Sequence, residues 1–274
     1  MHQTIGTYTL CLNEAMFMGP HLESWLPHVD EMVLFDGGST DGTLAIIKHA
    51  KIHNKHGAKI RLFENRDPKD LTEDYVRVFN ECLHSVSCDM AIFAHIDMML
   101  LEPGNLHDLG DAVAASMKMR SYAGDPDGAW FEIDGRGQAW KNIIRLRTPD
   151  LGAHYFGHYG AQNEDCYFRE ITGDRHEHYG TDFARYPYRV VDSGAVVMHF
   201  SDVRPMARRM DRMVKSLINQ GHDRYSANAI AAHHPRVEIK DGMGMKFRKA
   251  GGEAESVRAA CKQFSPFRRE VVSA

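Results

Sequence analysis

The stretch from residue 32 to residue 47 constrains the fold more than any other part of the chain. Residues 32–35 form a short apolar run, which predicts a buried strand ending at Asp36. The sequence Gly-Gly-Ser-Thr-Asp-Gly-Thr follows, and a helical pattern comes next. Glycine permits a positive φ and close approach of a backbone, and Asp41 or Thr40 can cap the helix. The whole string predicts a ligand-binding edge of an open α/β sheet; any single feature also fits an ordinary strand-to-helix turn.

The first hundred residues alternate between strand and helix patterns. Strands are predicted over residues 7–12, 32–35, 59–63 and 90–94. Helices are predicted just after Pro20 and over residues 42–54 and 70–86. The β-α-β-α-β-α-β order indicates a mainly parallel sheet with helices on both faces.

The later chain is less regular. Its pattern predicts helices over residues 106–119 and 205–220, and strands over residues 129–134, 141–147 and 189–200. Residues 148–189 are a long polar stretch rich in Gly, His, Tyr and Asp, of a kind that is usually functional. The segment from about residue 236 is basic and Gly-rich, and its pattern predicts no definite element.

Composition excludes several classes of protein. The chain has 274 residues, enough for one large domain or a domain with an extension. A net charge of −4 provides no overall basic field for nucleic acid, and no apolar run approaches the roughly 20 residues that span a bilayer. The N-terminus has no signal-peptide pattern, and the five cysteines are scattered. We therefore expect a cytoplasmic protein with reduced thiols, without a transmembrane segment.

Three acidic residues follow three of the early predicted strands. They are Glu14, Asp36 and Asp97. Because the carboxyl ends of parallel strands share one edge of a sheet, we expect these side chains to lie near one another. Together they offer acceptors for a base or a ribose and a hard ligand for Mg²⁺ or Mn²⁺, which in turn bind phosphate oxygens. Each acid taken alone also fits a helix cap or a solvated side chain.

The motifs resemble those of a known family. Leu-Cys-Leu-Asn-Glu at residues 10–14, Asp-Gly-Gly-Ser-Thr-Asp-Gly-Thr at residues 36–43 and His-Ile-Asp at residues 95–97 are similar to the nucleotide half of family-2-type glycosyltransferases. The resemblance covers residues 5–103 well and the remainder loosely. It implies the A-type fold: a Rossmann-like, mainly parallel central sheet flanked by helices, with a mixed C-terminal extension. It also divides the chain into a nucleotide-sugar-binding half (1–103), an acceptor-binding and catalytic half of the same domain (104–235) and a C-terminal tail (236–274).

The resemblance also implies roles for the residues of the first half. Glu14 would contact the ribose and Asp36 the base, commonly uracil. The family's Asp-x-Asp motif falls on residues 95–97, so Asp97 would be the metal ligand, and His95 replaces the first acid of the motif. The expected donor-nucleotide site therefore comprises Asn13, Glu14, Asp36, Gly37, Gly38 and His95, with Mn²⁺ or Mg²⁺ as the cofactor.

In the second half the resemblance implies a metal-side histidine and a catalytic base. His199 ends a late predicted strand and is the expected second metal ligand; a buried structural histidine is the alternative. Glu164 and Asp165 open a predicted helix and are the expected catalytic pair, while a simple helix N-terminus is the alternative. Weaker candidates for the base are Asp134, Asp182 and Asp192. The candidate sugar platform is Trp130, Trp140 and Tyr155, and packing of these aromatic side chains in the core is the alternative.

Arginines after His199 have two interpretations. Arg204 and Arg208 are candidates for contacting a diphosphate, and an exposed basic helix face is the alternative. The expected reaction is sugar transfer from a nucleotide-diphosphate donor, such as a UDP-sugar, to an acceptor hydroxyl, with inversion. The acceptor stays open among a glycan, a lipid-linked glycan, a protein, a small molecule and a modified nucleic-acid base. A nucleotidyltransferase and a non-catalytic nucleotide- or sugar-binding module are the alternative functions.

Overall fold

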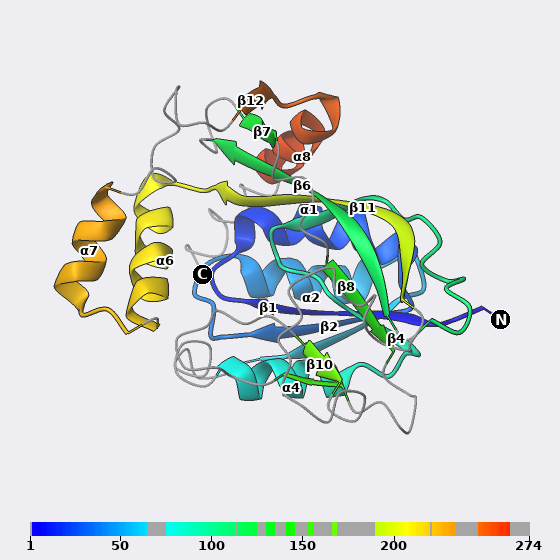
Figure 1. Ribbon diagram of the computed structural model, residues 1–274. Helices are drawn as coiled ribbons and strands as arrows, with labels where there is room; N and C mark the ends of the chain where they lie inside the picture. Colours follow the sequence, from blue (N-terminus) through cyan, green and yellow to red (C-terminus); the bar gives the residue numbers. More distant parts are fainter. Residues whose placement is uncertain are drawn as a thin grey trace.

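The fold is built on one large mixed sheet with helices on both faces (Figure 1). A computed structural model describes residues 2–64, 75–112, 114–124, 130–134, 141–145, 153–155, 166–168, 190–219, 221–233 and 246–263. Within these ranges ten strands form the sheet, and two short strands form a separate hairpin. The hairpin strands are β9 (Ala153–Tyr155) and β10 (Cys166–Phe168).

The N-terminal part of the sheet is parallel. Its strands lie in the order β4-β1-β2-β3, and every neighbouring pair is parallel. The strands are β1 (Ile5–Cys11), β2 (Glu31–Asp36), β3 (Lys59–Phe63) and β4 (Met90–Phe93). β2 is buried along its whole length, as expected for an apolar strand with helices on both sides.

The rest of the sheet is mixed. β8 pairs antiparallel with β4 and with β6, and β6 pairs antiparallel with β7, which β12 extends. β11 pairs parallel with β6 and antiparallel with β5. Because β8 is antiparallel to both β4 and β6, β6 runs in the same direction as β4 and β1. β11 is parallel to β6, so it runs in that direction as well. The strands are β5 (Met98–Glu102), β6 (Ala114–Gly124), β7 (Trp130–Asp134), β8 (Lys141–Arg145), β11 (Val190–Val203) and β12 (Lys246–Lys249).

The helices follow from the order of the parallel strands. α1 (Ala15–Trp25) and α2 (Thr43–His53) connect strands that advance in one direction, so right-handed crossovers place both on one face. α4 (Tyr75–Ser85) lies on the return from β3 to β4 and covers the other face (Figure 1). The remaining helical elements are η1 (Leu26–His28), α6 (Met206–Asn219), α7 (Arg224–His233) and α8 (Gly252–Gln263). Within the described ranges, none of the helices has the length and apolarity needed to cross a bilayer.

The predicted fold class is confirmed by this topology: a Rossmann-like, mainly parallel core with a mixed C-terminal extension. The helix predicted over residues 106–119 is wrong, because residues 114–124 form β6. The burial alternates with the period of a strand: Ala115, Met117 and Met119 are buried, whereas Lys118 is exposed. The helix is predicted because Ala, Met and Lys favour helices. The first helix begins at Ala15 rather than after Pro20. β5, β9, β10, α7, β12 and α8 have no counterpart among the predicted elements. The helix predicted to open at Glu164 and Asp165 is wrong over Cys166–Phe168, because these residues form the strand β10.

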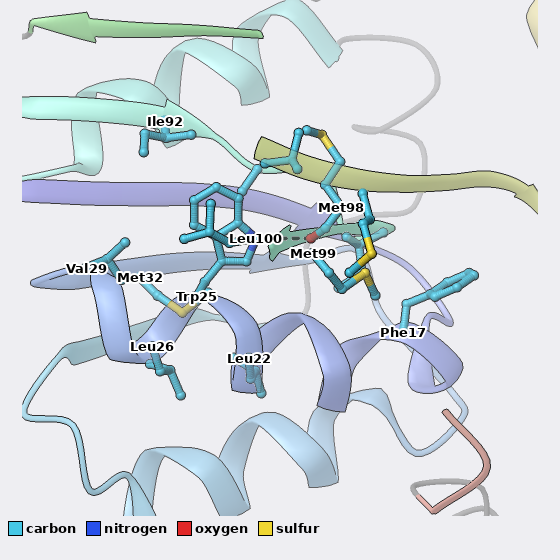
Figure 2. Packing of buried hydrophobic residues seen from close by; sticks show 14 of the residues in the cluster. Phe17, Leu22, Trp25, Leu26, Val29, Met32, Ile92, Met98, Met99 and Leu100 are labelled. Atoms are coloured by element: carbon cyan, nitrogen blue, oxygen red, sulfur yellow. Dashed lines mark hydrogen bonds between the residues drawn. The ribbon is translucent and has the colours of Figure 1, made fainter. Parts of the chain in front are cut away.

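A buried cluster joins α1 to the edge strand β5 (Figure 2). The Trp25 indole Nε1 donates to the carbonyl oxygen of Met98 at 3.0 Å, and Nδ1 of His21 lies 2.9 Å from the same oxygen. Phe17, Leu22 and the methionines of β5 fill the space around these polar groups. The shared carbonyl fixes α1 against β5 without leaving the buried donors unsatisfied.

His21 makes the stability of this cluster depend on pH. Burial lowers its pKa to about 4, and the hydrogen bond to Met98 offsets only part of that effect. An unfolded histidine titrates near pH 6.5, so the unfolded chain binds more protons between pH 6.5 and 4, and stability falls as the pH is lowered through that window. We expect the free energy of unfolding to drop by about 2 kcal/mol from pH 7.5 to pH 5 through His21 alone.

Urea titrations at the two pH values measure this drop. His21→Gln should reduce the pH dependence by that amount, whereas His53→Gln, at an exposed position, should leave it nearly intact. Equal pH dependence in the wild type and in His21→Gln would contradict the assignment.

Candidate functional site

The carboxyl ends of four strands meet at one edge of the sheet. β1, β2, β4 and β11 run in the same direction. Glu14 follows β1, Asp36 ends β2, Asp97 follows β4 and Arg204 follows β11. Glu14, Asp97 and Arg204 are in direct contact, which confirms the expectation that the strand-end acids near β1 and β4 converge.

Asp36 shapes the turn that follows β2. Its carboxylate is fully buried, and Oδ2 accepts the backbone N–H groups of Gly38 at 2.9 Å and Ser39 at 2.8 Å. Gly38 has a φ of +86°, a left-handed conformation that side chains beyond glycine rarely adopt. Asp36 therefore has a structural task in addition to the base contact expected from sequence, and that contact stays a prediction.

Asn13 braces the turn after β1 against the turn after β2. It has a φ of +56°, and its side-chain oxygen accepts the backbone N–H of Thr40 at 2.7 Å and of Asp41 at 3.3 Å. Its own N–H donates to Ser39 Oγ at 2.8 Å. The conformation is tolerated by asparagine better than by most residues. Asn13, expected to bind nucleotide, thus holds the wall of the site.

Asp41 serves both helices that begin at this edge. Oδ1 accepts the backbone N–H of Thr43 at 2.9 Å in the first turn of α2, and Oδ2 accepts that of Ala15 at 3.1 Å in the first turn of α1. Gly42, and neither Asp41 nor Thr40, is the N-cap residue of α2, but the Asp41 carboxylate still satisfies the first backbone N–H of both helices. A carboxylate between two helix N-termini is favoured by both helix dipoles.

The centre of the site is a buried guanidinium between two carboxylates. Arg204 Nη1 donates to Asp97 Oδ2 at 2.7 Å, and Nη2 lies 3.4 Å from both carboxylate oxygens of Glu14. The Arg204 side chain is only 1% exposed and that of Asp97 only 2%. The guanidinium carbon also lies 4.8 Å from the centre of the Phe17 ring, which suits a cation–π contact. Arg204 is thus part of the buried site and not of an exposed basic face.

The surrounding charges keep this guanidinium ionised. Burial by itself lowers the pKa of Arg204, but Asp97 and Glu14 raise it more, so the net direction is upward. Arg208 adds a second positive charge, because its Nη2 lies 3.1 Å from Glu14 Oε1 and donates to the carbonyl oxygen of Leu12 at 2.9 Å. Arg204 and Arg208, the two candidate diphosphate contacts from the sequence analysis, are therefore both held at this edge by Glu14.

Two histidines lie beside Asp97. His199 Nε2 is 3.5 Å from Asp97 Oδ1, and the rings of His95 and His199 are 6.0 Å apart between centres. His199 lies within β11 and is 18% exposed, so the ring can meet a ligand from outside. The expected proximity of His199 to Asp97 is confirmed.

Within the described part of the chain, no group of three or more His, Cys, Asp or Glu side chains could hold a metal ion. Asp97 Oδ1 and His199 Nε2 are nevertheless close enough to share one divalent cation. A carboxylate oxygen and an imidazole are donors that Mn²⁺ accepts. The fit is therefore that of a two-donor site, which needs ligands from a bound phosphate to complete it.

Cys11 lies beneath the same edge. Its Sγ donates to the carbonyl oxygen of Phe35 at 3.4 Å, and Asp36 Oδ1 lies 3.8 Å away. Burial, then the charges of Asp36 and Glu14, raise the pKa of this thiol well above its usual value. Cys11 therefore remains a protonated packing group, and Cys82, Cys88 and Cys261 are buried as well.

The described structure does not bring several of the expected site residues to this edge. Glu164, Asp165, Asp182 and Trp140 fall outside the described residues, as do the side chains of Asp134 and Tyr155. Trp130 is buried against Phe200, with ring centres 5.1 Å apart, so it packs in the core and offers no platform to a sugar. Asp192 is exposed and accepts the backbone N–H of Gly194 at 2.9 Å.

Sequence reasoning missed two features of the site. Phe17 was not singled out, and the sequence signal for it is only an aromatic three residues after Glu14, on the first turn of α1. The other is the brace formed by Asn13 and Asp41 between neighbouring turns. Its signal was present in the Asn-Glu pair at residues 13–14 and the Ser-Thr-Asp run at residues 39–41, since Asn and Asp favour such backbone contacts.

Comparisons with known proteins give only distant structural likenesses. No protein-family model matches the chain, and no curated protein does. A glucosyl-3-phosphoglycerate synthase from Mycobacterium tuberculosis, solved with Mn²⁺ and uridine-diphosphate-glucose, is 14% identical, with a TM-score of 0.41 over 90% of this chain and 86% of that chain. The same kind of enzyme with phosphoglyceric acid is 16% identical, with a TM-score of 0.40 over 81% of each chain.

A galactosyltransferase in complex with donor and acceptor sugar analogues is also similar. It is 15% identical, with a TM-score of 0.32, and the likeness covers 52% of this chain and 58% of that chain. At this strength these likenesses assign neither a family nor an activity to the chain.

The Asp97–Arg204 pair should be costly to break. Asp97→Asn leaves the buried Arg204 guanidinium without its nearest carboxylate, and removing one member of a buried pair typically costs 3–5 kcal/mol. We expect a loss of about 3 kcal/mol in the free energy of unfolding, measured by urea titration. Asp211→Asn, which breaks an exposed pair with Lys215, is the control and should cost less than about 1 kcal/mol. Equal effects of the two changes would contradict the geometry.

The brace at Asn13 can be tested by separating conformation from hydrogen bonding. Asn13→Ala removes the side-chain acceptor and places alanine in a left-handed conformation, so we expect a loss of about 2–3 kcal/mol. Asn13→Gly removes the same acceptor without the strain and should lose about 1 kcal/mol less. Thermal and urea unfolding of the two variants measure this difference. Equal losses would mean that alanine adopts the backbone conformation of residue 13 without strain.

Proposed function

We propose that the protein is a glycosyltransferase that uses a nucleotide-diphosphate sugar as donor. The observation that carries the proposal is the convergence of Glu14, Asp97, His199 and Arg204 at the carboxyl edge of a parallel sheet. This edge is where ligands bind in open α/β folds. The site combines a buried and a half-buried arginine with carboxylates and a partly exposed imidazole, which suits a diphosphate that leaves with negative charge.

The donor would lie across the turns after β1 and β2. Asp36 and the Gly37-Gly38 turn form the wall for the base, for which uracil is proposed, and Glu14 lies at the ribose side. The edges of Arg204 and Arg208, held in place by Glu14, direct positive charge at the diphosphate. A preorganised cation of this kind stabilises a leaving group without reorganisation during the reaction.

A divalent cation fits the site at Asp97 and His199, with Mn²⁺ favoured because imidazole is a poor ligand for Mg²⁺. Such an ion would act as a Lewis acid on the leaving diphosphate. His95 stands next to His199 and is proposed to contact the ribose or a phosphate. Glu164 or Asp165 is proposed to deprotonate the acceptor hydroxyl in an inverting transfer, and the acceptor stays open.

Binding and turnover of the donor test this function. In thermal unfolding scans with saturating UDP, ADP, GDP and UDP-sugars, with and without Mn²⁺, we expect UDP and UDP-sugars to raise the melting temperature. A ligand at a hundred times its dissociation constant stabilises the native state by about 2.7 kcal/mol. We also expect slow release of UDP from the matching UDP-sugar without acceptor, because water replaces the missing hydroxyl.

The alternatives give different results in the same experiment. Pyrophosphate release from a nucleoside triphosphate would indicate a nucleotidyltransferase. Donor binding without any UDP release, with candidate acceptors present, would indicate a binding module. The absence of stabilisation by every nucleotide would overturn the proposal.

A further inference from the structure

We propose that Arg209 binds an anionic group of the acceptor substrate, a phosphate or a carboxylate, at a place separate from the donor diphosphate. The assignment of this anion to the acceptor rests on the proposed function, whereas the anion site itself does not. The acceptor is then a charged molecule and not a neutral glycan.

Arg209 lies at the start of α6, directly after the functional edge. α6 follows β11 in the chain and begins where that strand ends (Figure 1). The backbone N–H of Arg209 donates to the carbonyl oxygen of Pro205 at 3.1 Å, which places the residue in the first turn of the helix. Its neighbour Arg208 contacts Glu14. Arg209 is therefore one residue away from a side chain that reaches the turn after β1.

The guanidinium of Arg209 has buried donors without acceptors. Nε and Nη1 are both buried, and among the residues that the structure describes neither has a hydrogen-bond partner. Buried donors in proteins are nearly always paired, and an exception calls for an explanation such as a ligand, an ion or a water. An arginine offers only donors, and its planar guanidinium matches the oxygens of phosphate and carboxylate groups. An anion is therefore the ligand that this side chain fits.

The nearby acids already have other partners. Glu14 and Asp97 contact the two arginines of the site described above. Asp211, two residues further along α6, pairs with Lys215 at 2.8 Å. Within the described part of the chain, these contacts leave the positive charge of Arg209 without a carboxylate. A bound anion would neutralise this charge and accept its buried N–H groups.

The direction of Arg209 separates this anion from the donor diphosphate. An α-helix has 3.6 residues per turn, so consecutive side chains leave it about 100° apart. Arg208 reaches Glu14 after β1, so Arg209 leaves α6 on a different side. The donor is proposed to lie across the turns after β1 and β2. An anion on Arg209 therefore belongs to the second substrate, which is the acceptor.

A solvated arginine and a structural arginine predict different behaviour. If only water satisfies the buried donors, replacement of Arg209 leaves the binding of anions unchanged. If the side chain holds α6 in place, its loss destabilises the free protein. A ligand site predicts neither result. Removal of an unpaired, partly buried charge should leave the free protein at least as stable as before and should weaken the binding of an anion.

Inorganic phosphate is the probe that decides between these roles. Thermal unfolding is followed across a phosphate titration at an ionic strength held constant with NaCl, since salt screens exposed charges. The dissociation constant of phosphate follows from the rise in melting temperature. We expect Arg209→Met to raise this constant about tenfold or more, because charge-assisted hydrogen bonds are lost. In buffer without phosphate, Arg209→Met should melt no lower than the wild type.

Arg224→Met is the matched control, because it removes the same charge from an exposed position on α7. It should leave the dissociation constant of phosphate nearly unchanged. The absence of a phosphate effect in the wild type, equal constants in Arg209→Met and the wild type, or equal losses in the two variants would overturn the proposal. A melting temperature of Arg209→Met well below that of the wild type in phosphate-free buffer would overturn it as well.

A second phosphate titration, in saturating UDP, separates the acceptor from the donor. Phosphate should still bind to the UDP complex through Arg209, and the dissociation constant of UDP should be the same in Arg209→Met and the wild type. Loss of the phosphate effect in UDP would place Arg209 in the donor site and overturn the assignment to the acceptor. Failure of every nucleotide to bind, with phosphate binding through Arg209 intact, would refute the proposed function and leave the anion site standing.

Discussion

The contact of the Arg204 guanidinium with Asp97 and Glu14 is the interaction on which the site depends. It joins the end of β4 and the start of α1 to the residue that follows β11, and all three partners are buried. Buried carboxylates need a partner, since an unpaired charge is far more costly than an unpaired neutral group. The position of each acid is therefore set by the arginine as much as by the strand that carries it.

In the polar turns around this centre, side-chain oxygens already accept backbone hydrogen bonds, which limits the contacts that each side chain can make with a ligand. Backbone N–H groups of the two neighbouring turns donate to side-chain oxygens of Asp36, Asn13 and Asp41. These bonds rigidify the wall against which a ligand would rest, and a rigid wall is what a binding site requires. A residue expected to contact a ligand can thus also be needed to form the pocket. The two roles can be separated only where stability and binding are measured together.

The parallel part of the fold could be predicted from sequence because its strands are short apolar runs with turn signals between them. The strand at residues 59–63 is predicted with its observed bounds, and the acids at the ends of β1, β2 and β4 follow from the same pattern. β6 could not be predicted, because Ala, Met, Lys and Arg favour a helix locally and tertiary pairing with β8 and β11 decides otherwise. The pairing of Arg204 with Asp97 could not be predicted either. It depends on β11 running parallel to β6 and ending at the edge where β4 ends, which no local pattern encodes.

The same arrangement has a consequence for the order in which the chain folds. Arg204 lies 190 positions after Glu14 and 107 after Asp97. Contacts at such separations form late, because long loops must close before these contacts are gained. During synthesis the two acids emerge well before the arginine. Until β11 is made, Glu14 and Asp97 lack the Arg204 charge, so we expect both carboxylates to stay hydrated or protonated. Pairing of β11 with β6 then brings the neutralising charge to the edge where the two acids lie.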